Sequence, residues 1–243
     1  MILGILQARS SSTRFPGKVL APLHGAPMIL QQVARLARSA RLDRVVVATS
    51  VDSSDDELVR VLESASVDVR RGPLDDVVGR FTVVVREFRP EQIVRLTADC
   101  PLADPAVIDL VIGEHVASAS DYTSNTLTPT FPDGLDVECV TVQAFDRLLA
   151  LDLSEGEREH VTLGLYSRPD EFALRNVAQS PDRSALRWTV DVPADLEFVS
   201  AVYARLYDGD PGFGQAEILR LLSEHPELSR TENDLARNSG MNK

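Results

Sequence analysis

Residues 3–20, LGILQARSSSTRFPGKVL, decide the fold of this chain. The apolar run at residues 2–6 has no alternating polar residue, which predicts a strand buried on both faces. The strand leads into a loop with four hydroxyl side chains at residues 10–13, a Pro-Gly pair and three cations: Arg9, Arg14 and Lys18. A strand end that offers N–H groups, hydroxyls and positive charge is typical of a phosphate-binding loop. The alternative is a basic surface turn, but a chain of net charge −12 has little cause to gather cations unless an anion binds.

Two common phosphate loops do not fit this stretch. A Walker A loop needs glycine five residues before its Gly-Lys pair and Ser or Thr after it, where this chain has Ser12 and Val19, and there is no GxGxxG. The segments 7–9 (QAR) and 16–20 (PGKVL) instead resemble the signature of the cytidylyltransferases that activate acidic sugars. They are most similar to the branch named for spore coat polysaccharide biosynthesis, which has glycine at or near the position of Ser11.

The composition is that of a globular protein, with 44% hydrophobic and 26% charged residues in 243. The apolar runs are too short to span a bilayer and the first residues show no export signal, so we expect a cytoplasmic protein that does not bind a membrane. Cys100 and Cys139 lie in no CxxC or Cys/His cluster, which argues against zinc. The net charge of −12 argues against a nucleic-acid partner.

Strands and helices alternate in the first half of the chain, which predicts a parallel sheet. Buried strands are expected at residues 2–6, 44–50, 67–71 and 92–98, and helices at 27–40, 53–64, 75–88 and 104–117. Right-handed crossovers place the carboxyl ends of these strands at one edge, together with the Arg9 loop, Ser50 and Asp99. Ligands of open α/β sheets bind at that edge.

The second half is less regular. Residues 121–130 are polar and predict turns; strands are expected at 134–141, 171–179 and 186–190, and helices at 143–151, 155–166, 194–207 and 215–223. We predict a single domain at residues 1–226 with an insertion at about 118–180, and a polar tail at 227–243. The resemblance implies an α/β, Rossmann-like nucleotidyltransferase fold of the glycosyltransferase-A-like kind. This fold is a three-layer sandwich with a mainly parallel sheet, and the insertion would serve dimerisation and acceptor binding.

Two aspartates at strand ends are the candidate metal ligands. Asp99 follows residues 92–98 and Asp191 follows residues 186–190. Mg²⁺ is commonly held by one or two carboxylates together with phosphate oxygens and water. The alternative is that each aspartate caps the next helix. Residues 96–102 and 188–197 resemble the two metal motifs of the family, with Ala98 in place of glycine and Val192 in place of threonine, so the resemblance implies Mg²⁺ on both aspartates.

The resemblance also implies a nucleotide site. Residues 48–50 and Arg71 match positions where the family binds the pyrimidine, whereas a solvated arginine is the alternative for Arg71. Asp75, Asp76 and Arg80 are common helix-surface residue types, although their spacing fits the branch. The nucleotide-binding residues expected are Gln7, Ala8, Arg9, Ser11, Ser12, Arg14, Lys18, Ala48, Ser50 and Arg71.

Acceptor binding is assigned to residues 133–138 and 157–161, which resemble segments of the same branch. The residues expected to face the acceptor are Asp133, Asp136, Glu138 and His160. The alternatives are a turn at 133–134, a solvated strand residue at 136 and an ordinary helix histidine at 160.

These features predict an enzyme that transfers CMP from CTP to an acidic or related sugar and releases pyrophosphate, for polysaccharide or glycoconjugate biosynthesis. The catalytic residues expected are Arg9, Lys18 and Asp99. One alternative is a nucleotidyltransferase of the same fold with another nucleotide or with a phosphonate or alcohol acceptor. Another is a non-catalytic nucleotide-binding protein. The resemblance also implies a homodimer.

Overall fold

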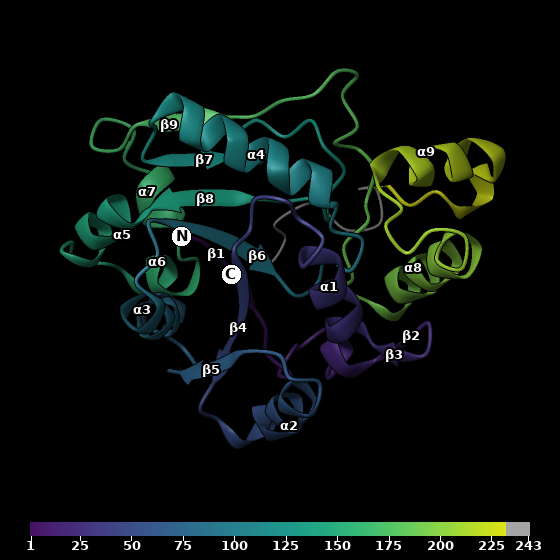
Figure 1. The fold of residues 1–243 in the computed structure, drawn as a ribbon, viewed down its shortest axis with the longest axis horizontal. Helices are drawn as coiled ribbons and strands as arrows, with labels where there is room; N and C mark the ends of the chain where they lie inside the picture. The colour runs from purple at the N-terminus through teal and green to yellow at the C-terminus, as the bar shows by residue number, and fades with distance from the viewer. Residues whose placement is uncertain (232–243) are drawn as a thin grey trace.

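A computed structural model describes residues 1–231 and forms one seven-stranded sheet (Figure 1). The strands are β1 (Ile2–Gln7), β4 (Arg44–Ser50), β5 (Val69–Gly72), β6 (Gln92–Thr97), β7 (Tyr122–Ser124), β8 (Glu138–Thr141) and β9 (Leu174–Asn176). Their order is β5-β4-β1-β6-β8-β7-β9. Only β8 runs against the others, because its pairings with β6 and β7 are antiparallel while the remaining pairings are parallel. The mainly parallel α/β sheet is therefore confirmed.

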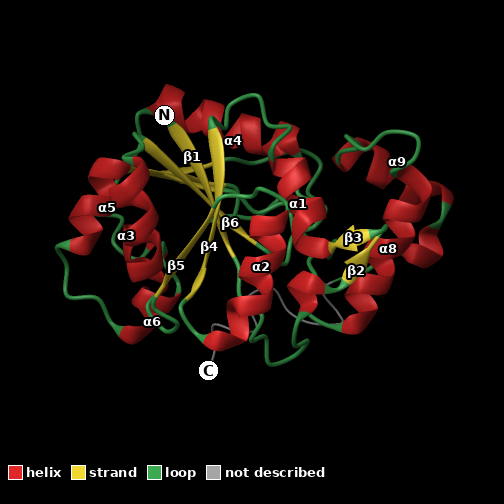
Figure 2. Cartoon of the chain, turned by 60° about the horizontal axis from the view of Figure 1, so that its bottom comes forward, coloured by secondary structure: helices red, strands yellow, loops and turns green. Residues whose placement is uncertain are grey.

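Helices cover both faces of the sheet and make two separate hydrophobic cores (Figure 2). The first core includes side chains of α1 (Met28–Leu36), α2 (Asp56–Ser64), α4 (Pro105–Ser118), α8 (Pro193–Leu206) and α9 (Gln215–Glu224). The second includes α3 (Val77–Phe88), α5 (Val142–Leu149) and α7 (Leu163–Tyr166). The position of β1 between the two cores accounts for its apolar sequence. Leu6 enters the first core, while Leu3 and Ile5 enter the second. A strand with two dry faces needs apolar residues at successive positions.

The predicted segment 118–180 adds strands to this same sheet instead of forming a separate body. It supplies β7, β8 and β9, with α5, α6 (Glu155–Glu159) and α7 packed beside them (Figure 1). The prediction of turns at residues 121–130 is wrong at β7, where buried Tyr122 pairs with Val140. Tertiary pairing decides this short strand, since its own sequence is polar.

Several predicted elements are shorter or different in the structure. The strand expected at 171–179 is only β9, and the strand expected at 186–190 is irregular chain with isolated bridges to Asp133 and Thr231. The helix expected at 155–166 is interrupted between α6 and α7. A short hairpin of β2 (Pro22–Leu23) and β3 (Ala26–Pro27) was not predicted. These differences depend on pairing partners and chain breaks, which a periodic pattern does not reveal.

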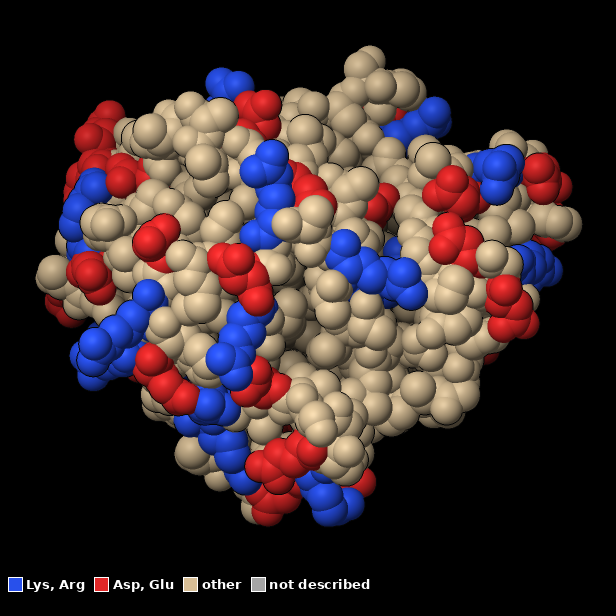
Figure 3. All heavy atoms as spheres, in the orientation of Figure 1, with Lys and Arg blue, Asp and Glu red and all other residues tan. Residues whose placement is uncertain are grey.

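The segment after α9 turns back onto the domain. It forms the 3₁₀ helix η3 (Pro226–Leu228), and the N–H of Arg187 then donates to the carbonyl of Arg230 at 3.0 Å. The predicted tail therefore begins with residues that contact the rest of the protein, and its positions 232–243 lie outside the described residues. Among helices of the described chain, none is both long and apolar enough to cross a membrane. Acidic and basic side chains are interspersed on the face in Figure 3.

Candidate active site

The carboxyl ends of the parallel strands lie together, as predicted. Gln7 pairs with both Ala48 and Thr97, so β1, β4 and β6 end side by side. Beyond β6, the N–H of Val190 donates to the carbonyl of Asp99 at 2.7 Å, and the Thr189 hydroxyl donates to the same oxygen. This backbone contact joins the two segments that carry the candidate metal ligands, although 90 residues separate Thr189 from Asp99.

Lys18 connects the two carboxylates. It begins the 3₁₀ helix η1 (Lys18–Leu20), and its Nζ lies 3.1 Å from Asp191 Oδ1 and 3.6 Å from Asp99 Oδ2. The ammonium also donates to the carbonyl of Val190 at 2.6 Å. Its side chain is only 10% exposed, and the residue predicted to lie in the loop begins this short helix. Lys18 is held inside the site by three oxygen acceptors.

Neither aspartate caps a helix, which removes the structural alternative considered from the sequence. Helix α4 is capped by Asp104, whose carboxylate accepts from the N–H of Ala106. The first turn of α8 is served by Asp195, which accepts from the N–H groups of Asp191 and Val192. The side chains of Asp99 and Asp191 therefore remain directed at Lys18.

The charge state of Asp99 fits a ligand of a cation. Burial alone would raise its pKa, but the positive charge of Lys18 and hydrogen bonds from Thr97 and Cys100 leave the pKa below its ordinary value. Asp99 is therefore ionised at neutral pH.

The donor set fits Mg²⁺ with an incomplete protein cage. One oxygen each of Asp99 and Asp191 approaches the same ammonium nitrogen, so a site for one positive charge already exists between them. Within residues 1–231 there is no group of three or more His, Cys, Asp or Glu side chains that could hold a metal. Two carboxylates are sufficient when phosphate oxygens and water complete an octahedral shell.

The loop after β1 is fixed by a buried acid that was not predicted. Asp55 is fully buried; one of its oxygens accepts from the N–H of Ser10 at 2.7 Å, and the other accepts from the N–H and hydroxyl of Ser50. Burial would raise its pKa, but these donors lower it overall. The Ser50 hydroxyl therefore holds Asp55, which anchors the Arg9 loop, and nucleotide binding by Ser50 stays a prediction.

Two arginines of the loop lie at its rim. Arg14 Nη2 is 3.1 Å from Asp191 Oδ1, and Arg9 Nη2 is 3.8 Å from Glu159 Oε1. Their side chains are 38% and 45% exposed, so both keep contact with solvent. Ser11 is exposed and Ser12 is half-buried on the same loop. The structure thus brings Arg9, Arg14 and Lys18 to one side of the sheet edge.

The other predicted nucleotide residues line the neighbouring strand ends. The N–H of Ala8 donates to the carbonyl of Ala48, and Arg95 donates to the Gln7 side chain at 3.4 Å. Arg71 donates to the carbonyls of Ser50 and Asp52, both at 2.8 Å. The guanidinium is therefore tied to the end of β4 and is no freely solvated side chain. Its contact with a base stays a prediction.

Arg80 is not a surface residue. It is 1% exposed, and it donates to the carbonyls of Pro73 and Leu74, which form the loop between β5 and α3. A Cβ on Gly72 would lie 2.9 Å from Arg80 Cα, so glycine allows α3 to pack directly on the strand end. Burial lowers the pKa of Arg80, and the nearby charge of Arg9 adds to this effect.

Two of the four predicted acceptor residues are engaged inside the protein. Glu138 is buried and bonded to Arg95, Tyr122 and Thr162, while buried Asp133 pairs with Arg187. Both carboxylates are therefore paired inside the protein, and their contact with an acceptor stays a prediction. The sequence could not reveal this, because their partners come from distant segments.

Asp136 and His160 keep their predicted role as hypotheses. Both are half-buried. Burial raises the pKa of the Cys100 thiol, and the negative charges of Asp99 and Asp136 raise it further. The carboxylates of Asp136 and Asp99 therefore both act on the thiol of Cys100.

Comparison with known proteins decides the family. The family model described as Cytidylyltransferase matches residues 3–222. The chain belongs to the cytidylyltransferase family. The resemblance drawn from residues 7–20 is thereby confirmed, and the protein is a CTP-dependent nucleotidyltransferase of the CMP-sugar synthetase group.

Relatives of this cytidylyltransferase agree in sequence and in fold. It is 33% identical over 235 residues to the spore coat polysaccharide biosynthesis protein SpsF of Bacillus subtilis, with 94% of this chain and 96% of the relative covered. It is 39% identical over 118 residues to a 3-deoxy-manno-octulosonate cytidylyltransferase of Anaeromyxobacter dehalogenans, with 47% of each chain covered.

Among solved structures, a cytidylyltransferase from Leptospira borgpetersenii matches with a TM-score of 0.88 at 26% identity, covering 93% of this chain and 95% of that one. The CMP:2-keto-3-deoxy-manno-octonic acid synthetase complexed with CTP matches with a TM-score of 0.66 at 19% identity, covering 84% and 98%. At that identity the second match shows the shared fold alone.

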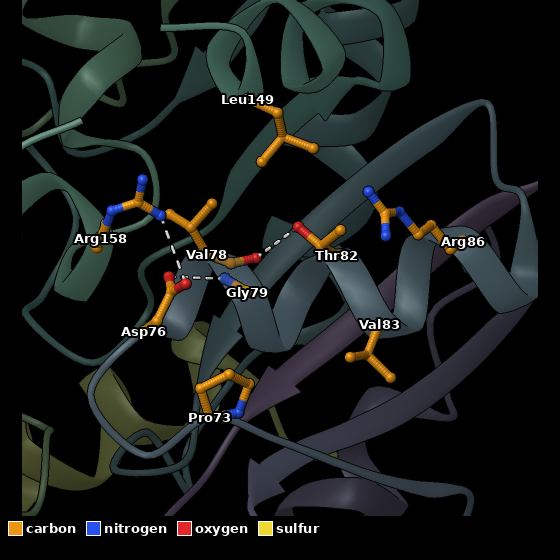
Figure 4. A pocket seen from close by; sticks show the side chains of 9 residues that line it. All are labelled: Pro73, Asp76, Val78, Gly79, Thr82, Val83, Arg86, Leu149 and Arg158. Carbon is orange, nitrogen blue, oxygen red and sulfur yellow. Dashed lines mark hydrogen bonds and ion pairs between the residues drawn. The ribbon is translucent and has the colours of Figure 1, made fainter. Parts of the chain in front are cut away.

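A pocket of about 310 Å³ lies beside α3 of the cytidylyltransferase (Figure 4). Arg158 of α6 faces Asp76 at one end of it, with 3.4 Å between Nη1 and Oδ2. Its remaining lining residues are Pro73, Val78, Gly79, Thr82, Val83, Arg86 and Leu149. None of them is a predicted site residue, so this pocket is separate from the carboxylate and lysine cluster.

Proposed function

We propose that this cytidylyltransferase transfers CMP from CTP to an acidic or related sugar, with release of pyrophosphate, for polysaccharide or glycoconjugate biosynthesis. The observation that carries the proposal is the contact of Lys18 with both Asp99 and Asp191 at the carboxyl edge of the sheet. Cations for a triphosphate and carboxylates for its metal ion then lie in one place. A cytoplasmic homodimer completes the proposal and rests on the family resemblance.

The transfer forms one bond and breaks one. An acceptor oxygen attacks the α-phosphorus of CTP, the bond from this phosphorus to the oxygen bridging to the β-phosphate breaks, and the electron pair leaves with pyrophosphate. The chain's own cations Arg9, Arg14 and Lys18 hold the triphosphate and offset the negative charge on the leaving group. Charge stabilisation of this kind is the main contribution of proteins to such reactions.

Asp99 and Asp191 would hold the divalent ion. When bound, Mg²⁺ would neutralise phosphate charge and favour ionisation of the acceptor hydroxyl. The carboxylates must be ionised for this role, and the lowered pKa of Asp99 meets that condition. A cation held by these carboxylates would compete with Lys18 for them, because two positive charges are unfavourable in the same place, and Lys18 would then contact phosphate oxygens.

Recognition of the base is assigned to the ends of β4 and β5. Arg71 joins the two strand ends by its bonds to the carbonyls of Ser50 and Asp52. Arg80 fixes the adjoining loop through the carbonyls of Pro73 and Leu74. A loop held in this way offers backbone groups in fixed directions, which suits discrimination of cytosine from other bases.

Pyrophosphate release with each of the four nucleoside triphosphates, over a panel of sugar acids and Mg²⁺, tests the proposal. We expect release with CTP and an acidic sugar, and little with the other nucleotides. A preference for UTP or GTP, or for a phosphonate or alcohol acceptor, would favour a different nucleotidyltransferase. Nucleotide binding without release under any condition would favour a non-catalytic protein.

Asp136→Ala should raise the KM for the acceptor far more than the KM for CTP. Its carboxylate, like that of Asp99, acts on the Cys100 thiol, and it would accept a hydrogen bond from the sugar. Loss of one such bond corresponds to roughly a ten- to hundredfold change. Steady-state kinetics with each substrate varied in turn would measure the effect. Asp170→Ala, at an exposed position of the same region, is the control. Equal acceptor KM values for Asp136→Ala and the wild type would leave Asp136 without a role in binding.

A further inference from the structure

Arg187 is a buried cation at the centre of a cluster of acids. Its side chain is 2% exposed, yet it contacts three carboxylates. Nη1 lies 3.2 Å from Asp133 Oδ2, while Nη2 lies 2.8 Å from Asp191 Oδ2 and 3.3 Å from Asp195 Oδ2. The three acids come from the segment before β8, the end of the irregular segment 186–191, and the first turn of α8. Arg187 therefore joins the acceptor-side segment to the candidate metal ligand.

The two oxygens of Asp191 are divided between different partners. Oδ2 accepts from Arg187, whereas Oδ1 faces Lys18 and Arg14 at 3.1 Å each. A carboxylate held through one oxygen cannot turn freely, so the other oxygen keeps its direction toward Lys18 and Asp99. Outer contacts of this type orient the residues that bind a metal.

We propose that Arg187 is a positioning residue, which fixes Asp191 for the divalent ion and joins the metal site to the segment that begins at Asp133. The inference rests on the proposed function, because it assigns Asp191 to the metal. Only arginine suits this position. Its planar guanidinium presents Nη1 and Nη2 to acids on two sides, while lysine has a single ammonium centre and cannot serve them in the same geometry.

The C-terminal segment belongs to the same cluster. Arg230 Nη2 lies 3.2 Å from Asp195 Oδ1, and the N–H of Arg187 donates to the carbonyl of Arg230. An isolated bridge joins Leu186 to Thr231 next to these contacts. Asp195 in turn accepts from the N–H of Asp191 at 2.8 Å. Residues 230–231 therefore support Asp195, and through it Asp191, from outside the nucleotide-binding half of the chain.

The competing explanation is that Arg187 only stabilises the fold, as other buried arginines do. Arg35 provides a matched control, because it is also 2% exposed and donates to the carbonyls of Ala103 and Phe213. None of the contacts described for Arg35 involves a candidate site residue. Arg35→Lys and Arg187→Lys both keep the positive charge and both remove a buried guanidinium, so any difference between them reports position and not charge.

The test is the binding of Mn²⁺ in the presence of CTP, measured by electron paramagnetic resonance, together with kinetics and thermal denaturation. Arg187→Lys should weaken Mn²⁺ binding by roughly tenfold and lower kcat by roughly ten- to a hundredfold, the range found when outer supports of metal ligands are removed. The KM for CTP should change little. Arg35→Lys should lower the melting temperature but leave Mn²⁺ affinity at the wild-type value.

The outcomes separate the inference from the proposed function. Equal Mn²⁺ affinity in Arg187→Lys and wild type, with a melting temperature lowered as in Arg35→Lys, would make Arg187 a structural residue and overturn the inference. If Asp191→Asn bound Mn²⁺ with the affinity of the wild type, Asp191 would not belong to the metal site. That result would overturn both the inference about Arg187 and the metal site of the proposed function.

A second variant covers the case in which Arg187→Lys does not fold. Arg230→Gln removes an outer member of the cluster at a partly exposed position, and should lower kcat and Mn²⁺ affinity to a smaller extent, roughly two- to fivefold. Arg220→Gln on α9 is its exposed control and should match the wild type. Identical behaviour of Arg230→Gln and Arg220→Gln would contradict the role given to the cluster.

Discussion

Asp99→Asn should reduce the turnover of CTP by at least about a hundredfold while the protein stays folded. Asp99 lies two residues beyond the end of β6, and its carboxylate shares Lys18 with Asp191; its negative charge is the property that a divalent ion requires. An amide keeps the shape but supplies no charge and is a weaker ligand. A hundredfold loss corresponds to about 2.7 kcal/mol of transition-state stabilisation, which is typical when one group that binds developing charge is removed.

The measurement is initial-rate pyrophosphate release over a range of Mg²⁺ concentrations. Asp99→Asn should need more Mg²⁺ for its residual activity, and the wild type should lose activity in excess chelator. Asp104→Asn is a matched control, because Asp104 is also an acid beyond the end of β6, yet it caps α4. If Asp99→Asn worked at the wild-type rate, the carboxylate would be structural and the proposed metal site would be wrong.

Lys18→Ala should abolish most turnover and also destabilise the protein in the absence of divalent ions. The ammonium is the counter-ion of both Asp99 and Asp191, which would repel each other without it. Removing one partner of a buried ion pair costs 3–5 kcal/mol, and these carboxylates keep partial contact with water, so a loss on the order of 1–2 kcal/mol is expected. Turnover should fall by roughly a hundredfold or more, because the triphosphate loses its innermost cation.

A divalent ion should repair the stability of Lys18→Ala but not its activity. Mn²⁺ would replace the missing positive charge between the carboxylates, and a ligand that binds only the folded state raises its stability. The rise in melting temperature on adding Mn²⁺ should therefore be larger for Lys18→Ala than for the wild type. Lys18→Arg tests whether the site requires a cation as small as an ammonium, since the Lys18 side chain is 10% exposed and leaves little room for a guanidinium. An equal rise for wild type and Lys18→Ala would show that lysine and metal do not share a site.

Local patterns in the sequence were enough for the first half of the fold. The uninterrupted apolar runs of β1, β4 and β6 correctly indicated strands buried on both faces, because a parallel sheet covered by two helical layers leaves no wet face. The common edge for the Arg9 loop, Ser50 and Asp99 followed from the handedness of the crossovers. The resemblance added the family, which no periodic pattern contains.

The composition carries a signal for the role of Lys18. The chain has only two lysines, Lys18 and Lys243, among its 25 Lys and Arg residues. A chain that otherwise uses arginine keeps a compact ammonium at the position where two carboxylates approach one cation. The compactness of the charged group matters there, because a single ammonium nitrogen can face both carboxylates and a carbonyl.

The sequence by itself determined the strands, the cation-rich loop and the two aspartates that follow strand ends, since each of these depends on neighbours a few residues away. Only the tertiary structure decided which acids are available. Glu138 and Asp133 were predicted to face the acceptor, and the structure shows that Arg95 and Arg187 pair with them inside the protein. The role of Asp55 also depends on a distant partner, because it anchors the loop through Ser10, 45 residues away in the sequence. A charge seeks its partner through space, and a buried acid is tolerated only where the completed fold supplies a donor, so these roles could not be assigned before the fold was known.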